Sequence, residues 1–280
     1  MTRIKLIATD LDGTFLVNHA QSVPENVKAL KEAQAAGIPV CACTARNWTT
    51  VRDIINKYGF DQFCVTNNGV SVVDSHTGLH RYRNRMDPEL VRTILDIATQ
   101  GQAPFLIVGH EKFYFLKNHL NQRFEQRRAW MQRMLGRGED IFYAAQTLDE
   151  LVEACGQDAE KIEWHLGPEN TRDGVFDQLS DCVDVEITAS SSRESYLEIT
   201  AKDATKGESL AVLAHIYDVQ PEEVLALGDN LNDIHMIMWA GTGVAMGDGD
   251  ARLQAVADWV TTDSTAGGWA KAVREIALGG

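Results

Sequence analysis

Short apolar segments alternate with helix-like segments along this 280-residue chain, and this alternation constrains its fold more than any other feature. Apolar runs at 4–9 and 38–43 flank a segment that Pro24 opens as a helix and Gly37 closes. A continuous apolar run is typical of a parallel strand that is covered on both faces. Strands and helices that alternate in this way predict an α/β fold with a doubly wound, Rossmann-like parallel sheet.

The same alternation returns near the far end of the sequence. We predict further helices over 50–58, 206–216, 233–239 and 269–276, and further strands over 63–65, 224–227, 244–246 and 259–260. Polar residues stand where the strands end, namely Asp10, Thr44, Asn67, Asn68, Asp229, Asp248 and Asp263. Because ligands bind at the carboxyl edge of open α/β sheets, these residues predict a site at that edge.

The middle of the chain has a different pattern, in which the expected strands mix polar and apolar residues. Strands are expected over 105–108, 113–116, 161–164, 183–186 and 196–199, with helices over 88–100 and 148–155. This pattern predicts an inserted α+β domain with an open sheet. We therefore expect a core domain formed by residues 1–84 and 203–280, and an inserted domain at 85–202.

Two carboxylates, Asp10 and Asp12, follow the first apolar run and stand on either side of Leu11, just before Gly13. Like charges this close raise each other's pKa unless a cation or a hydrogen-bond network relieves them. An acidic turn after an edge strand would explain the pair without any function. A metal-assisted reaction on an anionic substrate is the functional alternative.

Three further segments carry side chains that fit such a reaction. Thr44 ends the second predicted strand, and Asp229 ends a later one in a carboxylate-rich turn. Lys206 opens a predicted helix, where its positive charge is unfavourable because it opposes the helix dipole. A lysine at this position therefore indicates a functional role. Taken alone, Thr44 could be an ordinary β-branched strand residue without a function. Taken alone, Lys206 could be a solvated residue at the start of a helix. The four segments together favour phosphate chemistry.

With these segments in this order, the chain resembles the haloacid dehalogenase-like phosphatases. The motifs that carry the resemblance are Asp-x-Asp-Gly-Thr at 10–14 and Gly-Asp-x-x-Asn-Asp at 228–233. Asn68-Gly69 and Val-Ala-Met-Gly at 244–247 resemble the Cof-type group of this family. The resemblance covers the whole chain, and it implies a catalytic core with a large cap domain inserted after the third strand.

Two positions depart from the family pattern. A further family motif, Thr-Gly-Arg or Ser-Gly-Arg, corresponds to Thr44-Ala45-Arg46, so Ala45 replaces its glycine, which affects how closely the backbone approaches a ligand. Asp248 stands where the pattern usually has asparagine, and a carboxylate there would repel phosphate. We therefore leave Asp248 out of the expected binding residues.

The resemblance and the needs of phosphoryl transfer assign the same catalytic roles. Asp10 is the expected nucleophile, whose carboxylate attacks phosphorus and forms an aspartyl-phosphate. Asp12 is expected to protonate the leaving group and then to deprotonate the attacking water. This division requires a proton on Asp12 while Asp10 stays ionised, which a dication on Asp10 favours. Thr44 and Lys206 are expected to hold the phosphoryl oxygens.

A magnesium site is expected beside the nucleophile. Its expected ligands are the carboxylates of Asp10 and Asp229 and the main-chain carbonyl of Asp12, because hard oxygen donors suit Mg²⁺. Asn232 and Asp233 are expected to orient metal-bound water and the lysine. Substrate contacts are expected from Thr44, Ala45, Arg46, Asn68, Lys206 and Asn232.

Composition limits the partners and the location of the protein. The chain has 40 acidic and 26 basic residues, a net charge of −14, which argues against nucleic acid as a partner. No apolar stretch approaches the ~20 residues that span a bilayer. The first residues run directly into a strand, which leaves no room for a signal peptide, and the cysteine spacing predicts reduced thiols. We expect a cytoplasmic protein that acts on a small phosphorylated metabolite and binds no membrane.

The leading hypothesis is a Mg²⁺-dependent phosphatase that acts on a sugar phosphate or a phosphorylated cofactor. A phosphotransferase of the phosphomannomutase type shares the nucleophile and the cap class, so only product analysis separates it from a phosphatase. A non-catalytic regulator that binds metabolites is a third reading. The presence of every expected catalytic side chain argues against this third reading.

Overall fold

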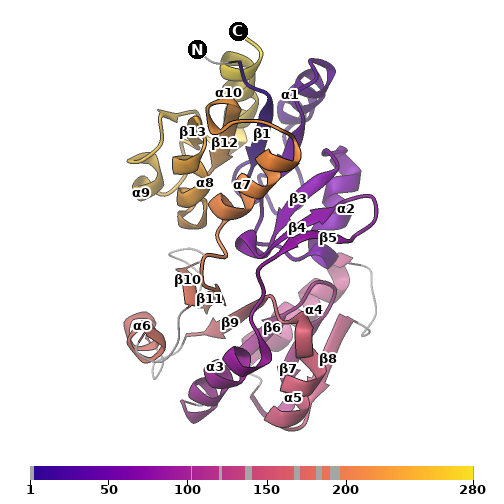
Figure 1. Cartoon of the computed structure of the whole chain (residues 1–280), viewed down its shortest axis with the longest axis vertical. Coiled ribbons are helices and arrows are strands. Elements are labelled where there is room, and N and C mark those ends of the chain that lie inside the picture. The colour runs from indigo at the N-terminus through magenta and orange to yellow at the C-terminus, as the bar shows by residue number, and fades with distance from the viewer. Residues whose placement is uncertain are drawn as a thin grey trace. The chain divides into compact units, whose positions relative to one another are not determined.

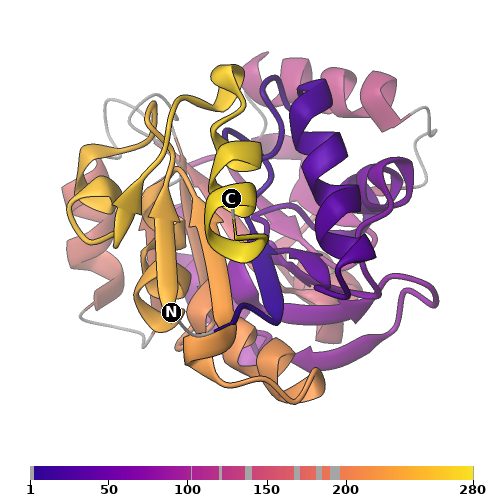
Figure 2. The same cartoon turned by 90° about the horizontal axis from the view of Figure 1, so that it is seen from above.

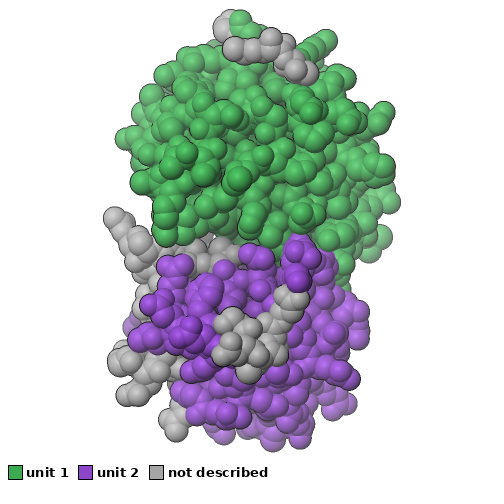
Figure 3. Space-filling model, turned by 60° about the vertical axis from the view of Figure 1, so that its left-hand side comes forward, with its two compact units in different colours: residues 1–46, 51–83, 204–280 green, residues 47–50, 84–203 purple. Residues whose placement is uncertain are grey.

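The chain divides into two compact units, each of which is described by itself (Figure 3). Unit 1 comprises residues 1–46, 51–83 and 204–280, and unit 2 comprises residues 47–50 and 84–203. The structure, a computed structural model, describes residues 3–101, 103–119, 122–135, 141–166, 171–180, 185–189 and 196–279.

A five-stranded parallel sheet forms the centre of unit 1 (Figure 1). Its strand order is β14-β13-β12-β1-β2. The strands are β1 (Leu6–Thr9), β2 (Val40–Ala42), β12 (Val224–Gly228), β13 (Thr242–Ala245) and β14 (Trp259–Val260). Strand β1 lies between two partners, because Leu6 pairs with Val224 of β12 and Ile7 pairs with Val40 of β2. These pairings confirm the parallel sheet that the apolar runs predicted.

Helices cover both faces of this sheet, as a doubly wound fold requires. They are α1 (Pro24–Ala35), α7 (Lys206–Ile216), α8 (Ile234–Trp239), α9 (Ala251–Gln254) and α10 (Gly268–Ala272). Helix α2 (Trp48–Tyr58) begins with residues that belong to unit 2 and continues in unit 1. Successive side chains of a strand point to opposite faces. Ala8 of β1 shares a buried cluster with Leu210 of α7 and Met236 of α8. Thr9 of the same strand contacts Trp269 of α10 on the other face.

A separate three-stranded antiparallel sheet completes the strands of unit 1. It consists of β3 (Phe63–Thr66), β4 (Ser71–Asp74) and β5 (His80–Arg83). The sequence predicted 63–65 as a third core strand, but the ladder of β3 runs to β4. An isolated parallel bridge between Cys43 and Val65 joins β3 to the end of the core sheet.

Unit 2 contains a six-stranded sheet in the order β10-β11-β9-β6-β7-β8, in which only the β7–β8 pair is parallel. The strands are β6 (Phe105–Val108), β7 (Phe113–Leu116), β8 (Phe142–Ala145), β9 (Lys161–His165), β10 (Val185–Ala189) and β11 (Tyr196–Ala201). The helices are α3 (Pro88–Gln100), α4 (Gln122–Leu135), α5 (Leu148–Cys155) and α6 (Arg172–Ser180). Of the strand predicted over 183–186, residues 183 and 184 lie outside the described residues.

Short helical turns connect these elements. They are 3-10 turns at Asn67–Gly69, Lys117–His119, Gly156–Asp158, Pro221–Glu223, Leu231–Asp233 and Ser264–Ala266, and a π-helical turn at Val273–Ala277. The cysteines within the described ranges are buried free thiols, at Cys41, Cys43, Cys64 and Cys155. Among the described residues, we find no helix with the length and apolar character that a membrane crossing needs.

Candidate active site

The nucleophile candidate Asp10 lies at the carboxyl end of β1, next to a buried lysine. Its backbone N–H donates to Leu227 O at 2.9 Å, which continues the ladder with β12. Nζ of Lys206, the first residue of α7, lies 2.6 Å from Asp10 Oδ1 and 2.6 Å from Asp233 Oδ1. Burial alone would lower the pKa of Lys206, but the two carboxylates raise it above its ordinary value. The lysine is therefore a fixed cation beside Asp10.

A glycine lets Asp229 approach the loop that follows the nucleophile. Gly13 has a φ of +93°, and a Cβ built there would lie 2.4 Å from Asp229 Oδ2. Thr14 Oγ1 donates to Asp229 Oδ1 at 3.0 Å. Any other residue at position 13 would be strained and would push this carboxylate away.

Three carboxylates meet at this place, and one of them is already committed. Asp10, Asp229 and Asp233 each bring an oxygen within 4.8 Å of the others. Asp233 Oδ1 accepts from the lysine, and its Oδ2 accepts from the backbone N–H groups of Asp229 and Asn230, both at 3.0 Å. Asp233 thus holds the turn in shape, which leaves Asp10 and Asp229 as the carboxylates suited to a ligand.

The donor set at these carboxylates fits a hard divalent cation. Burial, opposed by the charge of Lys206, raises the pKa of Asp10 to about 7. Burial and the charges of Asp10 and Asp233 raise the pKa of Asp229 to about 9. A cation bound to oxygen ligands relieves this repulsion and favours both ionised forms. The acidic cluster is therefore a candidate metal site.

Asp12 has different surroundings from its neighbour two positions earlier. Arg46 Nε donates to Asp12 Oδ2 at 2.7 Å, and its Nη2 donates to Asp12 Oδ1 at 2.5 Å. His19 Nδ1 lies 3.0 Å from the same Oδ1. Burial disfavours the charge of Asp12, but these contacts outweigh it and lower the pKa to about 2. In the metal-free protein the pKa of Asp10 therefore lies above that of Asp12, whereas the expected division of roles applies with a dication bound to Asp10.

The remaining expected binding residues form a connected group around Thr44 and Arg46. The backbone N–H of Arg46 donates to Thr44 Oγ1 at 3.2 Å, and the backbone N–H of Asn68 donates to Thr44 O at 3.1 Å. Asn232 Nδ2 donates to Asn68 Oδ1 at 3.0 Å. Ala45 lies between Thr44 and Arg46 in the chain and is partly exposed.

All the expected site residues belong to unit 1. They are Asp10, Asp12, Thr44, Ala45, Arg46, Asn68, Lys206, Asp229 and Asn232. One group of contacts surrounds Asp10 and includes Lys206 and Asp229. A second group surrounds Arg46 and includes Asp12 and Thr44. The two groups are joined because Asp10 and Asp12 lie two positions apart in the chain.

Three contacts of the site went beyond the sequence prediction. Thr14 belongs to the motif at 10–14, but the sequence did not predict that its hydroxyl bonds to Asp229. His19 lies in an irregular loop after the motif, and no spacing pointed to it. Asp248 accepts hydrogen bonds from Ser264 N at 2.8 Å and Ser264 Oγ at 2.7 Å. This carboxylate therefore holds a neighbouring turn, which accounts for an acidic residue at that position.

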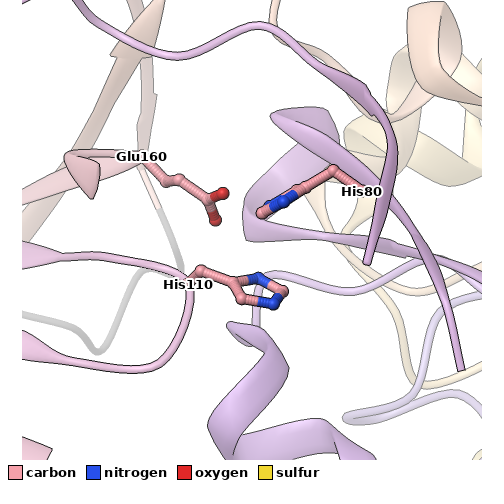
Figure 4. Close-up of side chains that lie close together, drawn as sticks. All are labelled: His80, His110 and Glu160. Atoms are coloured by element: carbon pink, nitrogen blue, oxygen red, sulfur yellow. The ribbon is translucent and has the colours of Figure 1, made fainter. Parts of the chain in front are cut away.

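Unit 2 also contains a pair of possible metal ligands, His110 and Glu160, whose side chains Figure 4 draws close together. A ring nitrogen of His110 and a carboxylate oxygen of Glu160 lie within 4.8 Å of each other. The His110 ring also stacks on Trp48, with centroids 6.2 Å apart. His80, also drawn there, belongs to unit 1. Two ligands are fewer than transition-metal sites use, so we assign no metal to this pair.

Comparison with known proteins identifies the class to which this fold and site belong. The family model for haloacid dehalogenase-like hydrolases matches residues 7–273. The chain therefore belongs to the haloacid dehalogenase-like hydrolases, which confirms the resemblance found in its motifs.

Individual relatives agree with this assignment. The 5-amino-6-(5-phospho-D-ribitylamino)uracil phosphatase YcsE of Bacillus subtilis (strain 168) is 30% identical over 275 residues, which cover 98% of this chain and 96% of that protein. The HMP-PP phosphatase of Yersinia pestis (strain Pestoides F) is 26% identical over 258 residues, which cover 89% of this chain and 86% of that protein. A solved haloacid dehalogenase-like hydrolase from B. subtilis has a TM-score of 0.82 at 25% identity and covers 98% of this chain and 100% of its own. These relatives confirm the predicted enzyme class, a phosphoric monoester hydrolase.

Proposed function

We propose that this protein is a Mg²⁺-dependent phosphatase that hydrolyses small phosphorylated metabolites, such as sugar phosphates or phosphorylated cofactors, through an aspartyl-phosphate. The observation that carries the proposal is the convergence of Asp10, Lys206 and Asp229 from three distant segments. The names of the relatives from B. subtilis and Y. pestis, both phosphatases of small molecules by those names, support this substrate class.

Asp10 and Lys206 supply the first step of the proposed reaction. An ionised oxygen of Asp10 attacks phosphorus, the bond from phosphorus to the leaving oxygen breaks, and an aspartyl-phosphate forms. Water then attacks this phosphorus, which releases inorganic phosphate and restores the carboxylate. Lys206 Nζ is held against Asp10 and neutralises negative charge that develops on the phosphoryl oxygens, together with the Thr44 hydroxyl.

Asp12 is suited as it stands to the second step. Its ionised carboxylate can accept a proton from the attacking water. To protonate the leaving group in the first step, Asp12 must first take up a proton from solvent water and give up part of its bond to Arg46. The proton that Asp12 accepts from the attacking water in the second step then replaces the one it gave away. We therefore assign Arg46 to holding Asp12 before substrate arrives, as well as to binding substrate.

The metal of the proposed enzyme is Mg²⁺, held by the carboxylates of Asp10 and Asp229 and by the main-chain carbonyl of Asp12. When bound, it supplies positive charge that stabilises the phosphoryl group during transfer. Asn232 and Asp233 orient its surroundings, and Asn68 and Ala45 border the substrate.

Each of the two domains expected from the sequence has a separate role in this proposal. Residues 1–84 and 203–280 form the catalytic domain, and the inserted residues 85–202 form a cap that helps to select the substrate. Small phosphorylated metabolites rather than nucleic acids are its partners in this proposal, because the chain is strongly acidic. We place the protein in the cytoplasm because its cysteine spacing predicts reduced thiols.

The experiment that tests the proposal measures phosphate release from p-nitrophenyl phosphate and from a set of sugar phosphates. We expect hydrolysis with Mg²⁺, loss of hydrolysis in EDTA, and no turnover by Asp10→Asn, because an amide cannot attack phosphorus. Asp250→Asn is the matched control, since Asp250 pairs with Arg252 on the surface. Turnover by Asp10→Asn, or return of the phosphate to the sugar, would contradict the proposal.

A further inference from the structure

We propose that Trp269 and Thr9 form a buried hydrogen-bond relay that positions the nucleophile Asp10, an inference that rests on the proposed function. Trp269 Nε1 donates to Thr9 Oγ1 at 2.9 Å, and Thr9 Oγ1 donates to Asp10 O at 2.7 Å. Thr9 and Trp269 have no exposed surface, and Asp10 is 5% exposed. Neither Thr9 nor Trp269 touches the reacting atoms, so both are positioning residues.

The chemistry of the groups fixes the direction of the relay. An indole N–H can only donate, so the Thr9 hydroxyl must accept from Trp269 and direct its own hydrogen to Asp10 O. Hydrogen bonds connected in this way strengthen one another in a low-dielectric interior. The relay is therefore stiffer than either bond alone.

The relay holds the peptide group on one side of Asp10, and the sheet holds the other. Asp10 N–H donates to Leu227 O of β12 at 2.9 Å, whereas Asp10 O accepts from Thr9. With both peptide groups held, the backbone torsions of Asp10 are fixed, and only its side chain can turn. The carboxylate then stays opposite Lys206 Nζ, where an attack on phosphorus must begin.

Trp269 is itself anchored to the loop that follows the nucleophile. Its ring meets the Phe15 ring edge to face at 5.1 Å. Asn26 of α1 donates to Phe15 O at 3.2 Å and accepts from Ala270 N at 3.1 Å. Figure 2 shows the yellow helix α10 beside α1 and the indigo strand β1. Helix α10 therefore contacts Thr9 and Phe15, which stand on either side of residues 10–14.

The test uses the full chain and variants that remove one hydrogen bond at a time. Thr9→Val keeps the shape of the side chain and loses the hydroxyl, and Thr9→Ser keeps a hydroxyl. Trp269→Phe removes the indole N–H together with part of the ring, so Tm must show how much of its effect comes from lost packing. The double variant lacks both groups. The matched control is Thr261→Val, because Thr261 Oγ1 donates to Gly268 O at 2.8 Å and so bonds to the same helix outside the relay. The measurements are kcat and KM for p-nitrophenyl phosphate, the Kd of Mg²⁺ by calorimetry, and Tm.

We expect Thr9→Val and Trp269→Phe each to lower kcat about fivefold, the effect of one net hydrogen bond, with little change in KM. The double variant should lose no more than either single one, because both break the same relay. Thr9→Ser and Thr261→Val should keep kcat within about twofold of the wild type. Wild-type kcat in Thr9→Val or Trp269→Phe, additive losses, or an equal loss in Thr261→Val would overturn the proposal.

If the wild-type protein hydrolyses no substrate, the proposed phosphatase function is wrong. The Kd of Mg²⁺ then tests the relay independently of activity. Thr9→Val and Trp269→Phe should then weaken Mg²⁺ binding about threefold, whereas Thr261→Val should not. Equal Mg²⁺ affinities in all variants would overturn the relay.

Discussion

Asp10 and Asp12 stand two positions apart and yet have opposite electrostatic surroundings. Asp10 is buried among carboxylates with one lysine, and its pKa is raised to about 7. Asp12 is bonded to Arg46 and His19, and its pKa is lowered to about 2 despite burial. Neighbouring groups whose pKa values are driven apart are typical of sites that divide nucleophilic and acid–base work.

The two hydrogen bonds from the Arg46 guanidinium to the Asp12 carboxylate predict that activity depends on the shape of the arginine head group as well as on its charge. Arg46→Lys keeps the positive charge but cannot donate two parallel hydrogen bonds, so we expect kcat/KM to fall about tenfold. Arg252→Lys is the matched control, because Arg252 makes the same two-bond contact to Asp250 at the surface. Equal kcat/KM values for the two variants would show that the arginine geometry is not needed.

The raised pKa values of Asp10 and Asp229 predict how pH and metal act together on stability. Unfolded carboxyls lose their protons near pH ~4, whereas the folded, metal-free protein keeps them up to about 7 and about 9. The stability that these protons contribute is therefore lost as pH rises through the folded pKa values. Because Mg²⁺ binds the ionised forms, it should raise Tm more at about pH 8.5 than at about pH 6.

Differential scanning fluorimetry with Mg²⁺ and with EDTA at both pH values checks this prediction. Asp229→Asn, which removes one ligand and the higher pKa, should remove most of the pH dependence of the Mg²⁺ effect. An equal Mg²⁺ effect at both pH values in the wild type would refute the linkage.

The sequence indicated the charged residues of the site, but not the contacts that set their pKa values in the metal-free protein. The sequence pointed to three charged residues, Asp10, Lys206 and Asp229, because each stands at a strand end or helix start. A charged side chain at such a position indicates a ligand site. The bond from His19 to Asp12 depends on the path of an irregular loop, which leaves no periodic signal. Without that bond and the Arg46 contact, the sequence could not show which of the two carboxyls stays ionised.

At the scale of elements, a tight turn supports the start of the helix that carries Lys206. Asn67 and Asn68 have φ values of 48° and 60°, and Gly69 has a φ of 106°. Ser209 Oγ of α7 donates to Gly69 O at 2.5 Å. A Cβ at Gly69 would lie 2.0 Å from Thr205 O, so the turn and the helix start are in direct backbone contact.

This contact predicts that Gly69→Ala will damage both stability and catalysis. The strained φ and the clash should lower the free energy of unfolding by about 3 kcal/mol and displace Lys206. Gly37→Ala is the matched control, because Gly37 also has a positive φ of 78° but meets nothing within 4 Å. It should cost about 1 kcal/mol and leave kcat unchanged. Urea denaturation and steady-state kinetics measure both effects, and equal losses in the two variants would refute the role of the contact.

Elements with a clear local pattern were predicted well, and elements defined by their partners were not. Helices α1 and α7 have their own start signals and apolar positions, so their limits followed from the sequence. Strand β5 has the sequence His-Arg-Tyr-Arg and is only partly buried, so it gave no apolar signal. Strand β3 is apolar enough for the core, but its pairing with β4 is a tertiary choice that periodicity cannot show.

At the scale of the whole molecule, the chain enters and leaves unit 2 at neighbouring points. Asn84 Nδ2 donates to Lys202 O at 2.8 Å. We therefore expect that replacing 85–202 with a short Gly-Ser linker leaves a catalytic domain that unfolds cooperatively and is stabilised by Mg²⁺. Circular dichroism melting measures this, with Asp10→Asn in the shortened chain as the control for metal binding. A shortened chain without a cooperative transition would contradict the proposed domain border.

The pairing of β1 with both β2 and β12 also has a consequence for protein synthesis. A ribosome makes β1 before unit 2, but β12, the strand that covers one of its edges, emerges only after residues 84–203 of unit 2. Until then, an apolar edge made early stays open to chaperones and to other nascent chains. The yield of active enzyme in the cell should therefore depend on how fast translation passes through the insert.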